Sequence, residues 1–267
     1  MKWVKGIAVV VGAVVITAFG IDATDTLRGS KSTLLGQLIA TDATACPDGM
    51  VAVAAGITFS CIDQFEVSAG GDCLYAHPAT SNETQQNLQM QTCSGRSEPG
   101  VLPWRHVTRD QASAICARRE ARLPAASEWY VVAQALINSD QECNVGSREL
   151  RETGEYENCR TPSGVSDMVG NVWEWVSGDV IAGQYKNRAL PEEGYVSEVD
   201  SEGIAVATTE TPGELFAGDY FWSDNTGTYG IMKGGFYGSQ RDAGIYTSHM
   251  QTKASFSGTA VGFRCVQ

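Results

Sequence analysis

The stretch Asp167-Met168-Val169-Gly170-Asn171-Val172-Trp173-Glu174-Trp175 decides the fold of this 267-residue chain. Its second half continues into Val176 and is rich in β-branched and aromatic residues, which favour a strand. Asn171 comes just before this strand and is typical of a turn. Alternate strand positions face the interior, so we expect at least one of Trp173 and Trp175 to be buried.

Two helices are predicted on the N-terminal side of this stretch. The first follows Thr108, which forms a capping-box pattern with Gln111 three residues later. The second covers residues 125–137, and Pro124 fits just before this helix or at its first turn. In each helix, apolar residues recur at helical spacing and form one face. These residues are Ala112, Ile115 and Cys116 in the first helix and Trp129, Val132, Ala133 and Leu136 in the second.

The rest of the chain predicts short strands and long connections. Residues 50–65 alternate in hydrophobicity around a glycine, as strands joined by a turn do. Residues 69–103 predict a long loop, and residues 178–229 predict an acidic, weakly patterned insertion. Strand character returns at residues 230–232 and 261–266. The 29 glycines and nine tyrosines also favour turns and strands over long helices.

The cysteines favour disulfides over a metal site. The chain has eight of them and three histidines, and no two cysteines form the C-x-x-C pair that is usual in structural zinc sites. Disulfides form in oxidising compartments, so this pattern predicts an exported protein. The cysteines are Cys46, Cys61, Cys73, Cys93, Cys116, Cys143, Cys159 and Cys265.

The N-terminus has the pattern of an export signal. Lys2 and Lys5 precede an uncharged apolar run over residues 6–21, as in a secretory signal peptide or a short membrane anchor. We therefore predict a signal peptide or N-terminal membrane anchor over residues 1–23, and cleavage after Gly20 stays open. Residues 24–45 are small and polar and predict a tether. The protein is expected outside the cytoplasm, secreted or anchored, with membrane contact only through this N-terminal segment.

The charge of the chain excludes one class of partner. The formal net charge is −12 and the isoelectric point is about 4.7. Such a surface repels nucleic acid, and no cluster of lysine and arginine reverses the charge locally. We expect no nucleic-acid partner.

Six segments together carry a family resemblance. They are Cys46-Pro47-Asp48-Gly49-Met50-Val51, Cys61-Ile62-Asp63-Gln64-Phe65-Glu66-Val67, Ala121-Arg122-Leu123-Pro124-Ala125-Ala126-Ser127-Glu128-Trp129, the stretch quoted above, Lys233-Gly234-Gly235-Phe236 and Gly262-Phe263-Arg264-Cys265. In this order they resemble the formylglycine-generating-enzyme, or sulfatase-modifying factor, family over residues 46–267. The resemblance implies a C-type-lectin-like α+β fold with low regular secondary structure and two main helices.

The resemblance also implies one disulfide, Cys116–Cys265, between the first helix and the C-terminal strand. Sequence proximity suggests the other three pairs, although eight cysteines allow about 105 connectivities. These pairs are Cys46–Cys61, Cys73–Cys93 and Cys143–Cys159.

The copper chemistry of the family is not expected here. The oxidases of the family bind copper through two thiolates shortly after the Gly-Gly of the fifth segment, and soft thiolates suit Cu(I). In this chain the two positions hold Ser239 and Gly244, and no cysteine lies between Cys159 and Cys265. A hydroxyl and a hydrogen atom cannot replace two thiolates, so we expect no copper and no oxidase activity.

Calcium is the cofactor that the resemblance still implies. The family places a cation at the turn around Asn171, and the candidate ligands are the carbonyls of Val169, Gly170 and Val172 and the carboxylate of Glu174. Calcium needs several such oxygens at once. In the alternative interpretation Glu174 pairs with an arginine such as Arg122 or Arg264.

The candidate ligand contacts follow the Gly-Gly motif, where this fold exposes its site. They mix aromatic and hydrogen-bonding groups, as recognition surfaces do, and they are Tyr237, Ser239, Gln240, Arg241, Asp242 and Tyr246. With residues 236–257 and the acidic insertion they predict a ligand surface. Trp104, Trp129, Trp173 and Trp175 could form a sugar-stacking platform, but their spacing favours a place in the core.

These observations favour an exported, non-oxidase module that binds a protein, peptide or glycan outside the cytoplasm. One alternative is a formylglycine-generating oxidase, or a related thiol-modifying enzyme, that acts on sulfatase cysteines. A third interpretation is a structural envelope protein in which the domain is a rigid spacer.

Overall fold

A computed structural model describes residues 46–267 except 54–57, 137–141 and 240–242. The described residues belong to one compact unit, Cys46–Gln267. The predicted signal peptide or anchor and the predicted tether lie outside the described residues. Gln240, Arg241 and Asp242 also lie outside them. No helix among the described residues is long and apolar enough to cross a membrane.

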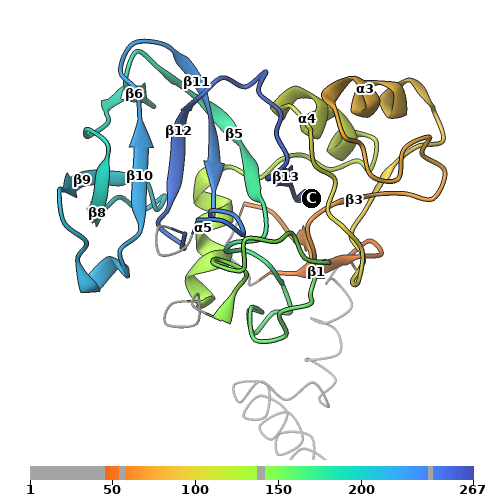
Figure 1. The fold of residues 1–267 in the computed structure, drawn as a ribbon, viewed down its shortest axis with the longest axis horizontal. Coiled ribbons are helices and arrows are strands. Elements are labelled where there is room, and N and C mark those ends of the chain that lie inside the picture. Colours follow the sequence, from red (N-terminus) through yellow and green to blue (C-terminus); the bar gives the residue numbers. More distant parts are fainter. Residues whose placement is uncertain (1–45, 54–57, 137–141, 240–242) are drawn as a thin grey trace, which may run out of the picture. The chain divides into compact units, whose positions relative to one another are not determined.

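The main element of the domain is a mixed sheet in the order β7-β6-β5-β11-β12-β10-β8-β9, with β13 paired to β5 (Figure 1). Most pairs are antiparallel, but β10–β12 and β13–β5 are parallel. The quoted stretch leads into the central strand β5, as predicted. The strands are β5 (Trp173–Ile181), β6 (Gln184–Tyr185), β7 (Arg188–Ala189), β8 (Gly194–Val199), β9 (Ala205–Thr209), β10 (Tyr220–Ser223), β11 (Thr228–Lys233), β12 (Ser248–Thr252) and β13 (Val261–Phe263).

The predicted insertion over residues 178–229 is wrong as a description of the fold. This region supplies β6 to β10 and the start of β11, and with them the strands at both edges of the sheet. The strands are two to six residues long, and register shifts interrupt the pairing of β8 with β9. Such short, interrupted strands give little periodicity in sequence.

Two small antiparallel sheets lie outside the main one. β1 (Met50–Ala52) pairs with β2 (Cys61–Asp63), which confirms the strands predicted over residues 50–65. β3 (Ser68–Ala69) pairs with β4 (Gly95–Arg96).

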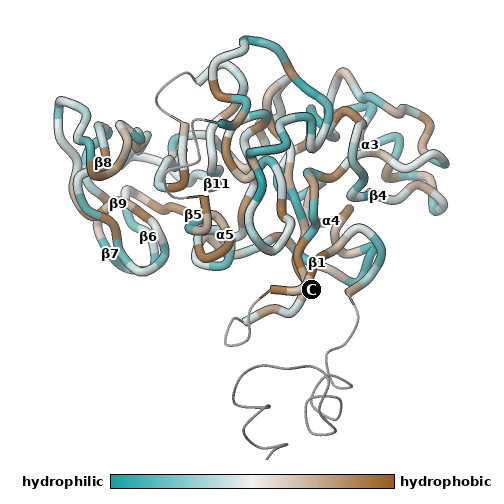
Figure 2. The backbone as a smooth tube through the Cα atoms, turned by 90° about the horizontal axis from the view of Figure 1, so that it is seen from below, coloured by the Kyte–Doolittle hydropathy of each residue, from teal (hydrophilic) through white to brown (hydrophobic). Residues whose placement is uncertain are grey.

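Both predicted helices are present. α4 (Arg109–Ala117) begins after Thr108, and Thr108 and Gln111 form both hydrogen bonds of a capping box. α5 (Ala126–Ala133) continues into a 3₁₀ turn, η1 (Gln134–Leu136). α5 lies behind the sheet in Figure 1, and Figure 2 shows hydrophobic stretches along β5 and α5.

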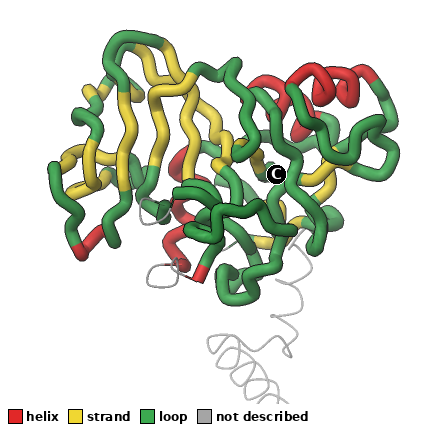
Figure 3. Tube along the Cα trace, in the orientation of Figure 1, coloured by secondary structure: helices red, strands yellow, loops and turns green. Residues whose placement is uncertain are grey.

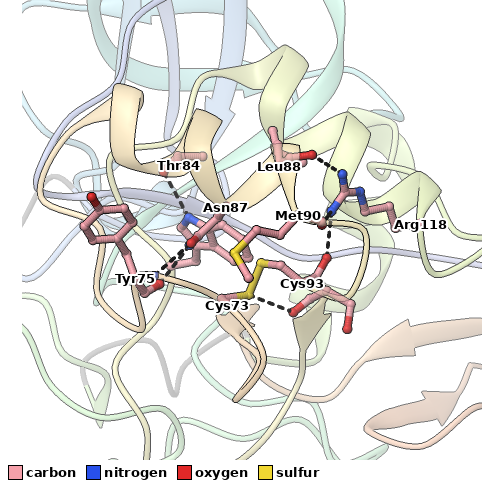
Figure 4. Close-up of a disulfide and its surroundings, with 10 residues drawn as sticks. Cys73, Tyr75, Thr84, Asn87, Leu88, Met90, Cys93 and Arg118 are labelled. Carbon is pink, nitrogen blue, oxygen red and sulfur yellow. Dashed lines mark hydrogen bonds between the residues drawn. A yellow bond between two sulfur atoms is a disulfide. The ribbon is translucent and has the colours of Figure 1, made fainter.

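A third helix, α3 (Ser81–Gln89), lies within the predicted loop of residues 69–103. This helix was not predicted, because the buried side chains of α3 are the polar Thr84 and Asn87 and give no apolar periodicity. Asn87 bonds to the backbone N–H and C=O of Tyr75, as Figure 4 shows. Arg118 donates to the carbonyls of Leu88, Met90 and Cys93 at the end of the helix.

The sheet and helices enclose two hydrophobic clusters. One lies between α5 and the sheet and includes Trp129, Phe221 and Met250. The other lies beside α4 and includes Trp104 and Trp175. Trp104, Trp129, Trp173 and Trp175 are all buried, so the core placement of these four tryptophans is confirmed. Figure 3 shows that much of the described chain is loop.

The C-terminal segment passes through the middle of the domain. β13 pairs with β5, and Val266 bridges to both Ile62 and Arg122. The N–H of Gln267 donates to the carbonyl of Cys61 at 2.9 Å. Residues far apart in sequence therefore meet at this segment.

All eight cysteines are paired, and the pairing is the expected one. The disulfides are Cys46–Cys61, Cys73–Cys93, Cys116–Cys265 and Cys143–Cys159. Four disulfides in one domain suggest an oxidising environment outside the cytoplasm.

Candidate functional site

A buried ion pair lies below the turn that the quoted stretch forms. Arg264 is fully buried, and its Nε and Nη2 atoms lie 2.6–2.9 Å from the carboxylate oxygens of Glu174. The same guanidinium donates to the carbonyls of Asp63 and Ser166. Trp129 Nε1 donates to Glu174 Oε2 at 2.6 Å. All three guanidinium nitrogens of Arg264 donate, and they connect the residue after β13 to β2 and β5.

Two further buried carboxylates surround this pair. Asn171 Nδ2 and the N–H of Val172 donate to Glu66, and the N–H of Gly154 donates to Asp167. Burial raises the pKa of Glu66 well above its usual range, and the neighbouring charges of Asp167 and Glu174 raise it further. One arginine thus faces three carboxylates.

The arrangement of Glu174 bears on the expected calcium site. Both carboxylate oxygens accept hydrogen bonds from Arg264, and Oε2 also accepts one from Trp129. A calcium ion could use these oxygens only by displacing those donors, so the residues present do not fit the ion in this arrangement. Among the described residues, no group of three or more His, Cys, Asp or Glu side chains could hold a metal. Glu174 has the arginine partner of the alternative interpretation, and calcium binding by Val169, Gly170, Val172 and Glu174 stays a prediction.

The two positions of the family's copper-binding cysteines lie in the loop after β11. Ser239 is buried, and its Oγ accepts a hydrogen bond from the N–H of Phe236 at 3.0 Å. A Cβ atom added to Gly244 would lie 2.0 Å from Asp219 Oδ1. Asp219 is itself buried and accepts a hydrogen bond from the N–H of Tyr246 at 2.7 Å. A side chain at position 244 would therefore force the buried Asp219 carboxylate to move.

A cavity of about 250 Å³ opens beside the same loop, between β5, β11, β12 and residues 252–261. The large aromatic side chains of Trp173, Phe236 and Phe256 are among the residues that line it. Four of its ten lining residues belong to the predicted ligand surface of residues 236–257. The complete lining is Trp173, Met232, Phe236, His249, Thr252, Phe256, Gly258, Thr259, Ala260 and Val261.

Residues 52–267 match the sulfatase-modifying factor enzyme 1-like domain. The chain belongs to this family. The family resemblance and the α+β fold are thereby confirmed, and no curated protein matches the chain.

Several solved structures are similar to this sulfatase-modifying-factor-like domain. The Major Tropism Determinant P3c variant is 12% identical with a TM-score of 0.45, and the match covers 83% of this chain and 52% of that one. CarF is 15% identical with a TM-score of 0.40, over 82% and 95% of the two chains. PvdO from Pseudomonas aeruginosa is 13% identical with a TM-score of 0.39, over 81% and 89%. The chain thus spans about half the length of the Major Tropism Determinant.

The predicted ligand contacts Tyr237 and Tyr246 lie in different parts of the domain. The ring of Tyr237 contacts Phe236, which lines the cavity. The ring of Tyr246 instead contacts Tyr130 and Phe216, in the cluster between α5 and the sheet. Ser239 is buried between these positions. As ligand contacts, Tyr237, Ser239 and Tyr246 stay predictions.

His249 is a residue at the cavity that the sequence did not single out as a ligand contact. It lies on β12, stacks on Trp222 at 5.7 Å between ring centroids and meets the edge of Trp173 at 5.6 Å. Its Nδ1 atom has no hydrogen-bond partner among the described residues. Burial lowers the pKa of His249 to about 4, so the ring is neutral at pH 7.

The low pKa of His249 predicts a loss of stability in acid. The folded state favours the neutral ring. The free energy of unfolding is therefore highest above the ordinary histidine pKa of 6.5 and decreases as the pH falls towards 4. His249→Phe should remove up to about 3 kcal/mol of the stability difference between pH 7 and pH 4.

Urea unfolding at both pH values, followed by tryptophan fluorescence, measures this difference. His77→Phe is the matched control, because His77 is exposed. An unchanged pH dependence in His249→Phe would contradict the prediction.

Proposed function

We propose that this chain is an exported ligand-binding module that does not carry out the copper-dependent oxidation of its family. The proposal rests on the residues that replace the two copper-binding cysteines, Ser239 and Gly244. Ser239 uses its hydroxyl inside its own loop, and Asp219 fills the space at Gly244. Among the eight cysteines none is free, so no thiolate is available for Cu(I).

Support for a binding role comes from the cavity beside this loop. Binding sites are typically concave and mostly apolar, with a few polar groups that orient the ligand. The cavity combines Trp173, Phe236 and Phe256 with the polar side chains of His249 and Thr252. The proposed ligand is a glycan, peptide or protein outside the cytoplasm.

The test supplies copper to the oxidised protein and measures bound metal and oxygen consumption with a cysteine-containing peptide. We expect no stoichiometric copper and no oxygen uptake. Stoichiometric copper together with peptide-dependent oxygen uptake would restore the oxidase and overturn the proposal.

Restoring the two cysteines should not restore a copper site. In Ser239→Cys/Gly244→Cys the new side chain at position 244 collides with the buried Asp219 carboxylate, and such overpacking typically costs about 1–3 kcal/mol. We expect a lower unfolding midpoint and no stoichiometric Cu(I). Gly244→Ala should show the same loss of stability.

Gly213→Ala is the control, because a Cβ atom there meets nothing within 4 Å. A Gly244→Ala variant as stable as Gly213→Ala, or a double variant that binds one Cu(I), would show that position 244 accepts a side chain after all.

A further inference from the structure

Five aromatic rings form a continuous row across four strands of the sheet. The row runs from Tyr195 on β8 through Tyr220 and Trp222 on β10 to His249 on β12 and Trp173 on β5. Successive ring centroids are separated by 5.1 Å, 4.7 Å, 5.7 Å and 5.6 Å. The centroids of Trp173 and Trp222 are also 5.6 Å apart, so Trp173, Trp222 and His249 form one group at this end of the row. The strand pairing holds the row in place, because Tyr195 is in register with Tyr220 and Trp222 with His249.

The row lies on the face of the sheet that is turned away from α5. Successive side chains of a strand point to opposite faces, and Phe221 and Met250 belong to the cluster that contains α5. Their neighbours Tyr220, Trp222 and His249 therefore point the other way and are partly exposed. In Figure 1 no described helix lies in front of β8, β10 and β12.

One end of the row enters the cavity described above. Trp173 and His249 belong to both the row and the cavity lining. The other end, at Tyr195, reaches β9, where Thr209 is in register with Tyr195. An extended ligand could thus contact the cavity and several rings at once.

On β10 and β12 the side chains beside the rings are polar and uncharged. β10 has the sequence YFWS and β12 the sequence SHMQT, so His249 is the one ionisable side chain on these two strands besides Tyr220. Gln251, two residues from His249, shares its face. Thr209 and Thr252 add hydroxyl groups at the two ends. β10 and β12 therefore offer apolar ring surface and neutral hydrogen-bonding groups.

We propose that this aromatic row binds a neutral, extended glycan chain, with one end of the chain in the cavity beside Trp173. The C–H face of a pyranose ring is apolar and its rim carries hydroxyl groups, which matches rings flanked by amide and hydroxyl side chains. An anionic chain is repelled by the net charge of −12. A cationic peptide finds no carboxylate on β10 or β12 to pair with.

The inference rests on the proposed binding function and names its ligand class. The test titrates the full-length oxidised protein with neutral β-1,4-linked hexasaccharides of glucose and of N-acetylglucosamine, by calorimetry and tryptophan fluorescence. We expect binding of a neutral hexasaccharide and none of a hexagalacturonate. Trp222→Ala should weaken binding about tenfold or more, and Trp222→Phe should keep most of it.

The variant Tyr195→Ala distinguishes binding along the whole row from binding in the cavity alone. It removes the ring farthest from the cavity, so we expect weaker binding of the hexasaccharide and unchanged binding of a disaccharide of the same sugar. Tyr75→Ala is the matched control, because Tyr75 contacts Gln86 and Asn87 beside α3 and lies off the row. It should leave both affinities unchanged.

Two results would overturn the glycan proposal. One is the absence of binding to every neutral hexasaccharide, and the other is binding that Trp222→Ala and Tyr195→Ala leave unchanged. Row-dependent binding of a cationic or proline-rich peptide in place of glycans would assign the row to a peptide. The copper and oxygen measurement is independent of these titrations, so failure of the glycan proposal is distinguishable from failure of the proposed function.

Discussion

Replacing Arg264 by methionine is expected to lower the free energy of unfolding by about 3–5 kcal/mol, the usual cost of breaking a buried ion pair by removing one partner. The variant leaves Glu174, Glu66 and Asp167 buried together without their shared cation. It also leaves the carbonyls of Asp63 and Ser166 without their donor. Urea unfolding of the oxidised protein at pH 7 measures the loss.

The control for Arg264 is Arg96→Met. Arg96 forms an exposed ion pair with Glu98, with both side chains 48% exposed, and such pairs are worth at most about 1 kcal/mol. A loss in Arg264→Met no larger than in Arg96→Met would contradict the prediction.

The same unfolding experiment tests the calcium prediction when it is repeated with excess calcium and with a chelator. Calcium-dependent stabilisation that Glu174→Gln abolishes would show that the ion displaces Arg264 or Trp129 from that carboxylate. Equal stability in both conditions would leave Glu174 with the arginine as its partner.

The second large effect is expected from the disulfide between α4 and the segment after β13. Cys116 and Cys265 are 149 residues apart, and on the chain-entropy model a closed loop of this length stabilises the fold by about 5 kcal/mol. The variant Cys116→Ala/Cys265→Ala should lose stability of that order, measured by urea unfolding under oxidising conditions.

The comparison is Cys46→Ala/Cys61→Ala, which opens a loop of 15 residues and should lose about 3 kcal/mol. A smaller loss from the Cys116–Cys265 pair than from the Cys46–Cys61 pair would contradict the loop-length argument.

Those parts of the fold that depend on local signals could be predicted. Thr108 and Gln111 marked the start of α4, and the helical spacing of Trp129 marked α5. α3 was missed because its buried Thr84 and Asn87 are polar, and their partners lie outside the helix. The strands β6 to β10 were missed because each is short and is stabilised by pairing across the sheet.

The candidate site divides in the same way. The sequence predicted the absence of the copper thiolates from Ser239 and Gly244, because that conclusion needs only residue identities. The aromatic row could not be predicted, because Tyr195, Trp222 and His249 lie on three strands whose neighbours are set by the fold. The alternation in Tyr220-Phe221-Trp222 was the one local signal for it.

The central position of the segment from β13 to Gln267 has a consequence for biogenesis. Arg264 and Val266 contact residues about 200 positions earlier, and Cys265 closes the longest disulfide loop. Until this segment has left the ribosome, Glu174 has no counter-charge and β2 lacks its bridge to Val266. The contacts that join β2, β5 and α4 to this segment therefore form only after residues 261–267 have been added to the chain.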